Sequence, residues 1–486
     1  MSAITQEITD KYETVIGLEV HAQLKTKSKI FCDSATEFGN EHNSQVCPVC
    51  MGYPGVLPVL NKKVLEYAIL TGLALNCEIA RHSKFDRKQY FYPDLPKNYQ
   101  VSQFDMPVCK NGYIEINGRV IRINRAHLEE DAGKLVHAGA TGLAGSTYSL
   151  VDYNRTGVPL LEIVSEADIN SPEEARIYVE ELRNIVRYLG VCDGNLEEGS
   201  LRCDANISIR PVGQKELGTK AEIKNMNSFK ALQRALEYEV ERQIELVESG
   251  GKVVQETRLW KEDEEITISM RSKEEAHDYR YFPEPDLVPI EIDADWVHRI
   301  RETMPELPAQ KLKRYIDELG LSKYDAEVLV NSMEMALFLD KTVELKINAK
   351  SAANWLMGDI TAYLNEHKTT IDKIELTPES LAEMIILIDK GTISNNIAKK
   401  LIAPLMKNGG SVKKMVEEQG MSVISDEGAL KDTIKKILEA NKGEVEKYKS
   451  GKPQLFGFFV GQVMKETKGR ANPETVNKIL KEELDG

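Results

Sequence analysis

The sequence contains no long hydrophobic run, since no stretch approaches the roughly 20 uninterrupted apolar residues that a membrane-spanning helix needs. Its N-terminus, MSAITQEITDKYETV, lacks the basic segment followed by an apolar one that marks a secretory signal. Cysteine is also sparse, because seven in 486 residues do not build the dense disulfide framework of a small secreted domain. We therefore expect a cytoplasmic protein whose cysteines are reduced thiols or metal ligands.

Basic residues are in deficit as well. The net charge of −14 argues against a general nucleic-acid binder, whose phosphate contacts need a basic surface. The charge is uneven, since residues 406–486 hold 15 Lys or Arg against 13 Asp or Glu. A contact with an RNA backbone is therefore expected at this end of the chain, although its lysines equally suit a solvated helix face.

Common motifs for nucleotide binding and nucleophilic catalysis are missing. The sequence has no G-x-x-x-x-G-K-[ST] loop, no G-x-G-x-x-G fingerprint and no G-x-S-x-G elbow. If the protein uses ATP, its phosphates must be held by metal ions and side chains.

The chain is long enough for several domains, and its patterning changes along its length. Short alternating or apolar runs predict strands at 14–24, 112–123, 158–164, 201–210 and 219–225. Long helices are predicted from Ser171 and Ser228, and a last helix from Asn472. We predict an α+β multidomain protein: a domain with a large mixed or antiparallel sheet over 1–290, an all-α helical domain over 291–405, and a small α-helical tail over 406–486.

Acidic residues within strand-like runs are the most informative feature. Glu19, His21 and Gln23 are two apart and share one face of the predicted strand. Glu162 lies in the apolar run VPLLEIV, and the adjacent acids 129 and 130 lie in HLEEDAG. A buried charge is costly unless it is paired or coordinates a cation. Ordinary salt bridges explain any one of these acids, but three such segments together favour a magnesium site.

Two further strands present a polar face. The even positions of LRCDANISIR are Arg202, Asp204, Asn206, Ser208 and Arg210, and Lys220, Glu222 and Lys224 follow in TKAEIKN. A solvent-exposed sheet face has the same pattern. Arg, Lys and Asn mixed with carboxylates also suit phosphate and Mg²⁺, and we favour this interpretation.

Cys32 and the knuckle Cys47-Pro-Val-Cys50 form half of a zinc ribbon, whose closed site needs four ligands. Asp33 or His42 would supply the fourth ligand. The knuckle is equally well explained as a remnant that binds no metal. Elsewhere, the segment 84–96 mixes cations with tyrosines, which suits stacking on the terminal adenosine of a tRNA or closure of a core.

Six segments resemble blocks of the GatB family, also called GatB/GatE: ETVIGLEVH (13–21), KFDRK (84–88), YFYPD (90–94), HLEEDAGK (127–134), EGSLRCDAN (198–206) and DYRYFPEPD (278–286). The similarity runs along the whole chain. It implies an N-terminal cradle domain with a kinase site, a helical domain, and a tail of the YqeY type that contacts tRNA. Zinc-bearing relatives have C-x-C where this chain has Cys32-Asp-Ser34.

The resemblance also implies a reaction. ATP phosphorylates the side-chain carboxylate of misacylated Glu-tRNA(Gln) or Asp-tRNA(Asn), and ammonia from the partner GatA displaces phosphate, within a heterotrimer with GatC. The family's magnesium ligands fall on His21, Glu130 and Glu162, with Glu19 alongside. From the face pattern, Arg202 and Asp204 are expected to act in catalysis with Glu130 and Glu162, and Asn206, Lys220 and Lys224 to contact ATP.

Two other classes compete with this hypothesis. A non-enzymatic RNA-binding adaptor explains the tail and the knuckle, but the acids beside His21 would repel phosphate without a cation. A metal-dependent hydrolase explains the acids but gives no role to two helical appendages. ATP turnover that requires aminoacylated tRNA separates the amidotransferase from both.

Overall fold

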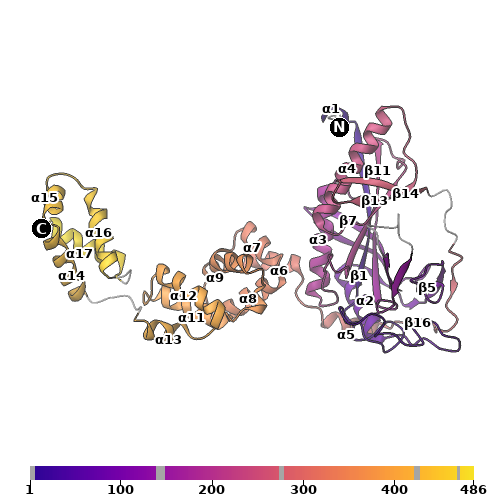
Figure 1. Ribbon diagram of the computed structural model, residues 1–486, viewed down its shortest axis with the longest axis horizontal. Coiled ribbons are helices and arrows are strands. Elements are labelled where there is room, and N and C mark those ends of the chain that lie inside the picture. Colours follow the sequence, from indigo (N-terminus) through magenta and orange to yellow (C-terminus); the bar gives the residue numbers. More distant parts are fainter. Residues whose placement is uncertain (1–5, 138–147, 273–278, 421–426, 468–470, 486) are drawn as a thin grey trace. The chain divides into compact units, whose positions relative to one another are not determined.

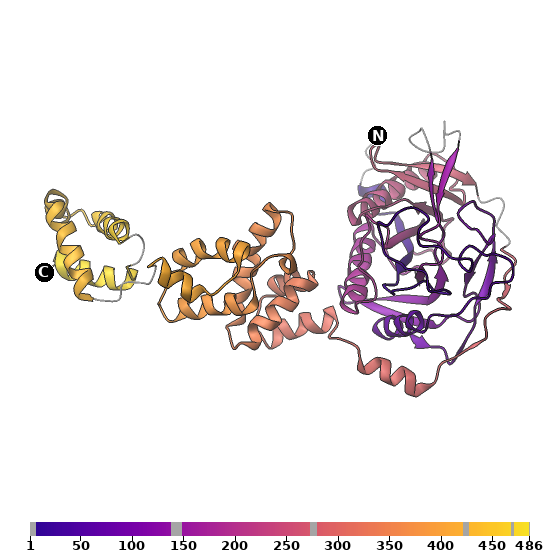
Figure 2. The same ribbon diagram turned by 60° about the horizontal axis from the view of Figure 1, so that its bottom comes forward.

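The computed structural model describes residues 6–137, 148–272, 279–420, 427–467 and 471–485. The chain divides into two compact units, Met1–Leu307 and Pro308–Gly486 (Figures 1 and 2). The first contains a large mixed sheet and the second is helical, which confirms the predicted fold class. The finer division at 290 and 405 stays a prediction. Among the described helices, none has the length and apolar character required to cross a membrane.

The first unit is built on a nine-stranded sheet in the order β14-β13-β12-β11-β1-β10-β7-β6-β2. All neighbours pair antiparallel except β12 and β13, which are parallel. The strands are β1 (Tyr12–Gln23), β2 (Glu78–Ile79), β6 (Cys109–Ile116), β7 (Arg119–Glu130), β10 (Pro159–Ser165), β11 (Leu201–Pro211), β12 (Ala221–Lys224), β13 (Glu256–Lys261) and β14 (Ile266–Ser272).

One predicted strand is wrong in its extent. The run 112–123 forms two strands, β6 and β7, joined by a hairpin. Asn117 and Gly118 make the turn, with φ of 51° and 78°. An Asn-Gly pair between alternating runs favours such a two-residue turn, because both positions need positive φ.

Helices cover one face of the sheet. α2 (Lys62–Ala74), α3 (Pro172–Tyr188) and α4 (Phe229–Glu248) pack on side chains such as Ile16, Val20 and Ala205, all at 0% exposure. The Ser171 and Ser228 side chains cap α3 and α4, as the sequence predicts. Strict alternation along β1 buries the apolar side chains here and turns the polar ones to the other face.

Smaller elements complete the first unit. A three-stranded sheet has the order β15-β4-β5, and β3 pairs with β16 and β8 with β9. The bounds are α1 (Gln6–Thr9), β3 (His82–Ser83), β4 (Asp86–Gln89), β5 (Tyr99–Ser102), β8 (Lys134–His137), β9 (Ser149–Asp152), β15 (Phe282–Pro283), β16 (Ile290–Glu291) and α5 (Ala294–Glu302).

The second unit consists of helices: α6 (Pro308–Asp317), α7 (Lys323–Val330), α8 (Met333–Glu344), α9 (Ala349–Trp355), η1 (Leu356–Ile360), α10 (Thr361–Glu366), η2 (Ile371–Lys373), α11 (Pro378–Asp389), α12 (Asn395–Asn408), α13 (Val412–Glu418), α14 (Glu427–Ala440), α15 (Lys442–Lys449), α16 (Leu455–Glu466) and α17 (Pro473–Asp485). The last four share their own core. The predicted final helix is confirmed, since Asn472 Oδ1 accepts from Glu474 N at 2.8 Å and Val476 and Leu480 are fully buried.

Candidate functional site

Strand register gathers the polar side chains on the sheet face opposite the helices. His21 on β1 lies opposite Glu162 on β10 and opposite Arg202 on β11. Glu162 in turn lies opposite His127 on β7. Because directly opposed residues point to the same face, these side chains form one continuous row across the sheet.

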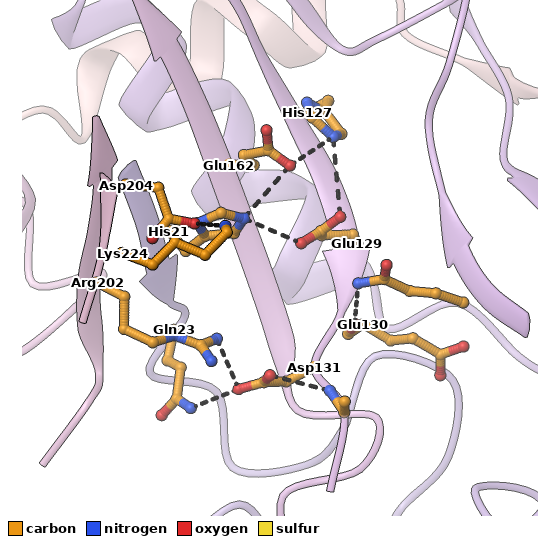
Figure 3. Close-up of polar contacts among 12 residues, drawn as sticks. His21, Gln23, His127, Glu129, Glu130, Asp131, Glu162, Arg202, Asp204 and Lys224 are labelled. Carbon is orange, nitrogen blue, oxygen red and sulfur yellow. Dashed lines mark hydrogen bonds and ion pairs between the residues drawn. The ribbon is translucent and has the colours of Figure 1, made fainter. Parts of the chain in front are cut away.

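Two carboxylates and two imidazoles form the centre of this row (Figure 3). His21 Nε2 lies 3.5 Å from Glu129 Oε1 and 3.4 Å from Glu162 Oε2. His127 Nε2 lies 3.3 Å from the same Glu162 oxygen. One ligand atom from each of His21, Glu129 and Glu162 lies within 4.8 Å of the other two. We call these three residues the acid–histidine cluster.

The acid–histidine cluster is strongly coupled electrostatically. Burial lowers the pKa of His21, but the carboxylates of Glu162, Glu129 and Asp204 outweigh burial and raise it to about 9. Burial likewise opposes the charge of Glu162, and His127 and His21 hold its pKa well below the usual range. The cluster thus keeps its acids ionised although Glu129 and Glu162 are buried.

The donor set fits a hard divalent cation. Among the described residues, Glu129 Oε2 is buried and has no hydrogen-bond partner. An unsatisfied buried carboxylate oxygen is costly, and a cation relieves that cost. Carboxylate oxygens with one imidazole nitrogen suit Mg²⁺ or Mn²⁺.

The structure does not bring Glu130, a predicted magnesium ligand, to His21. Its carboxylate accepts from Lys97 Nζ and, at 3.0 Å, from Val101 N. Consecutive strand residues point to opposite faces, so only one of the two adjacent acids can join His21. That acid is Glu129. The sequence signal that could have found it is the two-residue spacing of His127 and Glu129, which matches the spacing of Glu19 and His21.

The other predicted residues extend the row along the same face. Asp131 accepts from Gln23 Nε2 at 2.8 Å and from Arg202 Nη2 at 3.0 Å. Lys224 Nζ donates to Asp204 and lies 3.0 Å from Glu222 Oε1. Cations and acids therefore alternate from β12 to β7.

Glu19 lies outside the acid–histidine cluster and accepts from Asn206 Nδ2 at 2.9 Å. Both residues line a recess of about 260 Å³, together with Gly17, Ser208 and Lys220. The predicted ATP contacts Asn206 and Lys220 thus lie at one hollow of the polar face.

The predicted cysteine site also forms a cluster. The sulfur atoms of Cys32, Cys47 and Cys50 all lie within 4.8 Å of one another. His42, an expected fourth ligand, instead pairs with Asp152 at 2.7 Å. The three thiols can hold a metal ion, and a closed zinc site needs one more ligand.

An acidic and imidazole-bearing sheet face beside a helical unit is the architecture of an enzyme with a catalytic domain and an appended helical part. A family model described as the GatB/GatE catalytic domain matches residues 14–298, and a second, described as a GatB domain, matches residues 337–484. The chain therefore belongs to the GatB family.

Similar proteins cover the chain almost completely. Each is named as the GatB-type subunit of an aspartyl/glutamyl-tRNA(Asn/Gln) amidotransferase. The protein of Crocosphaera subtropica is 58% identical over 99% of this chain and 99% of its own length. The protein of Carboxydothermus hydrogenoformans is 57% identical, over 98% and 99%, and that of Thermodesulfovibrio yellowstonii 56%, over 97% and 100%.

Proposed function

We propose that this chain is the subunit of an aspartyl/glutamyl-tRNA(Asn/Gln) amidotransferase that activates the side-chain carboxylate of a misacylated tRNA with ATP. The observation that carries the proposal is the acid–histidine cluster beside Arg202 and Lys224 on one sheet face. Family membership over the whole chain supports it.

The reaction has two displacements. An oxygen of the substrate carboxylate attacks the γ-phosphorus of ATP, the bond from that phosphorus to the β,γ-bridging oxygen breaks, and ADP leaves with the electron pair. Ammonia then attacks the carbonyl carbon of the acyl phosphate. Inorganic phosphate leaves, the nitrogen loses a proton, and the amide of Gln-tRNA(Gln) or Asn-tRNA(Asn) remains.

His21, Glu129 and Glu162 are the residues that would hold Mg²⁺. A bound magnesium ion offsets negative charge on the transferring phosphoryl group. His127 positions Glu162, because its Nε2 lies 3.3 Å from that carboxylate. Glu130, predicted to be a ligand and catalytic, has the role of anchoring Lys97 and Val101.

Arg202 and Lys224 supply positive charge for the phosphates. Arg202 Nε is buried and, within the described residues, lacks a hydrogen-bond partner, which leaves a donor for an incoming oxygen. Asp204 positions Lys224 through their hydrogen bond and acts in catalysis through it. Asn206 and Lys220 contact ATP from the 260 Å³ recess, a volume suited to part of a nucleotide.

The partners follow from the chemistry of the site. Family membership implies a complex of several subunits that acts on tRNA. GatA supplies the ammonia, GatC completes a heterotrimer, and the basic tail over 406–486 contacts tRNA. We further propose the three-domain division at 290 and 405, a cytoplasmic location, and zinc at Cys32, Cys47 and Cys50 only where a fourth ligand is added.

The test is ATP hydrolysis by the chain reconstituted with GatA and GatC in Mg²⁺, with and without Glu-tRNA(Gln) or Asp-tRNA(Asn). We expect hydrolysis to rise when either misacylated tRNA is added. Binding of tRNA without nucleotide turnover would instead support a non-enzymatic adaptor, and hydrolysis independent of tRNA would support a metal-dependent hydrolase.

A further inference from the structure

Lys88 is a cation of β4 to which the sequence assigns no role. Its Nζ lies 5.0 Å from the ring centroid of Tyr279 and 5.7 Å from that of Tyr90. Those two rings contact each other edge to face, with centroids 6.0 Å apart. Lys88 is partly buried between them. We call Lys88, Tyr90 and Tyr279 the lysine–tyrosine pocket.

Other cations of this segment have structural partners. The Arg87 guanidinium donates to both carboxylate oxygens of Glu284, at 2.7 and 2.8 Å. The Lys84 ammonium pairs with Asp86. Within the described part of the chain, Lys88 forms no ion pair or hydrogen bond and has only its aromatic contacts. An ammonium with three donors that stays unpaired away from bulk water is costly unless a ligand satisfies it.

The lysine–tyrosine pocket faces the acid–histidine cluster. Burial lowers the pKa of Lys88, but the fields of Glu129 and Glu162, with those of Tyr281 and Tyr279, outweigh burial and raise it. The lysine is thus charged and close enough to both acids to sense them, yet it pairs with neither. Space between a cation and a metal-binding cluster suits an anion that reacts at that metal.

We propose that Lys88 binds the side-chain carboxylate of the aminoacyl group and so selects an acidic over an amide substrate. This inference rests on the proposed function. A single ammonium with aromatic walls matches one carboxylate on a short methylene chain, whereas the phosphates have Arg202 and Lys224 on the far side of the cluster. Once the carboxylate becomes an amide, the ion pair with Lys88 is lost and the product is released.

The experiment uses the full chain in complex with GatA and GatC. Affinities for Glu-tRNA(Gln) and for Gln-tRNA(Gln) are measured by filter binding for the wild type, Lys88→Met and Lys88→Arg. One charge-assisted hydrogen bond predicts that the wild type binds the acidic form about 10-fold to 100-fold more tightly. Lys88→Met should bind both forms equally, and Lys88→Arg should keep part of the preference.

Two controls separate a contact with substrate from a structural role. Lys110→Met removes an exposed lysine of β6 and should leave the preference unchanged. The KM for ATP should stay within about 2-fold in Lys88→Met, because the phosphates are bound elsewhere. If Lys88→Met fails to fold, Lys88→Gln keeps the polar side chain without the charge and should show the same loss.

The inference is overturned if the wild type does not discriminate the two tRNAs, or if Lys88→Met discriminates them as the wild type does. Failure of the proposed function has a different signature. In that case the wild type itself shows no stimulation of ATP hydrolysis by misacylated tRNA.

Discussion

At the scale of single residues, the site depends on which side of a strand each acid occupies. Glu129 and Glu130 are neighbours in sequence, yet one contacts His21 and the other contacts Lys97. Sequence alone shows that a carboxylate here can reach the cluster, but not which one, because that depends on the register of β7 against β10.

The two acids make a matched pair for a metal-binding experiment. Glu129→Gln should weaken Mn²⁺ binding by at least about 10-fold, because it neutralises a ligand. Glu130→Gln should leave Mn²⁺ affinity unchanged. Titration calorimetry or electron paramagnetic resonance of the purified chain measures both, and the reverse ranking would show that the cluster does not hold the cation.

Lys88 shows why another part of the site is not readable from the sequence. Its strand, β4, pairs with β15, where Arg87 lies opposite Phe282. Tyr279, which borders the lysine, comes from the same distant segment. Local patterning predicts a cation among tyrosines, and only this long-range pairing places the group beside the acids.

At the scale of elements, α4 is held on the sheet by a buried charge network. Glu239 of α4 is fully buried and lies 2.6 Å from Arg242 Nη2 and 3.3 Å from Arg258 Nε. Arg258 of β13 also lies 2.5 Å from Glu256 Oε1. Removing one partner from such a network is costly because the other charge stays buried.

This network predicts a pH-dependent stability. Burial raises the pKa of Glu256, but Ser269, Arg258 and Arg242 outweigh burial and lower it below 4.5. A lowered pKa means that the stabilisation is complete above the unfolded value and is lost as the pH falls through the folded one. Glu256→Gln should therefore cost about 1–3 kcal/mol at pH 7, and this difference should shrink below about pH 4.5.

Urea unfolding at several pH values measures the effect. The control is Glu264→Gln, an exposed acid that pairs with Lys261 at the surface, which should change stability by less than about 0.5 kcal/mol. A deficit for Glu256→Gln that stays constant down to acid pH would refute the charge network as its cause.

The elements themselves follow closely from local chemistry. Alternation along β1 predicts its buried and polar faces, and Ser171 and Ser228 predict the starts of α3 and α4. The hairpin at Asn117-Gly118 was readable in principle, since both residues adopt positive φ readily. The order of the nine strands was not, because neighbours such as β1 and β11 come from segments far apart in the chain.

At the scale of the whole molecule, chemistry and RNA binding are assigned to different units. The acid–histidine cluster and the lysine–tyrosine pocket lie in Met1–Leu307, and the basic tail lies in Pro308–Gly486. The composition predicts this separation, since charge is uneven along the chain. The account therefore requires that the substrate's carboxylate, carried by tRNA, becomes an acyl phosphate on the first unit.

The most direct measurement follows an oxygen atom. Glu-tRNA(Gln) labelled with ¹⁸O in both side-chain carboxylate oxygens is incubated with ATP, Mg²⁺, glutamine and the chain in complex with GatA and GatC. Phosphorylation of the carboxylate predicts that one ¹⁸O atom appears in each inorganic phosphate released, by mass spectrometry, for each amide formed. Amide formation with unlabelled phosphate would contradict carboxylate activation by this protein.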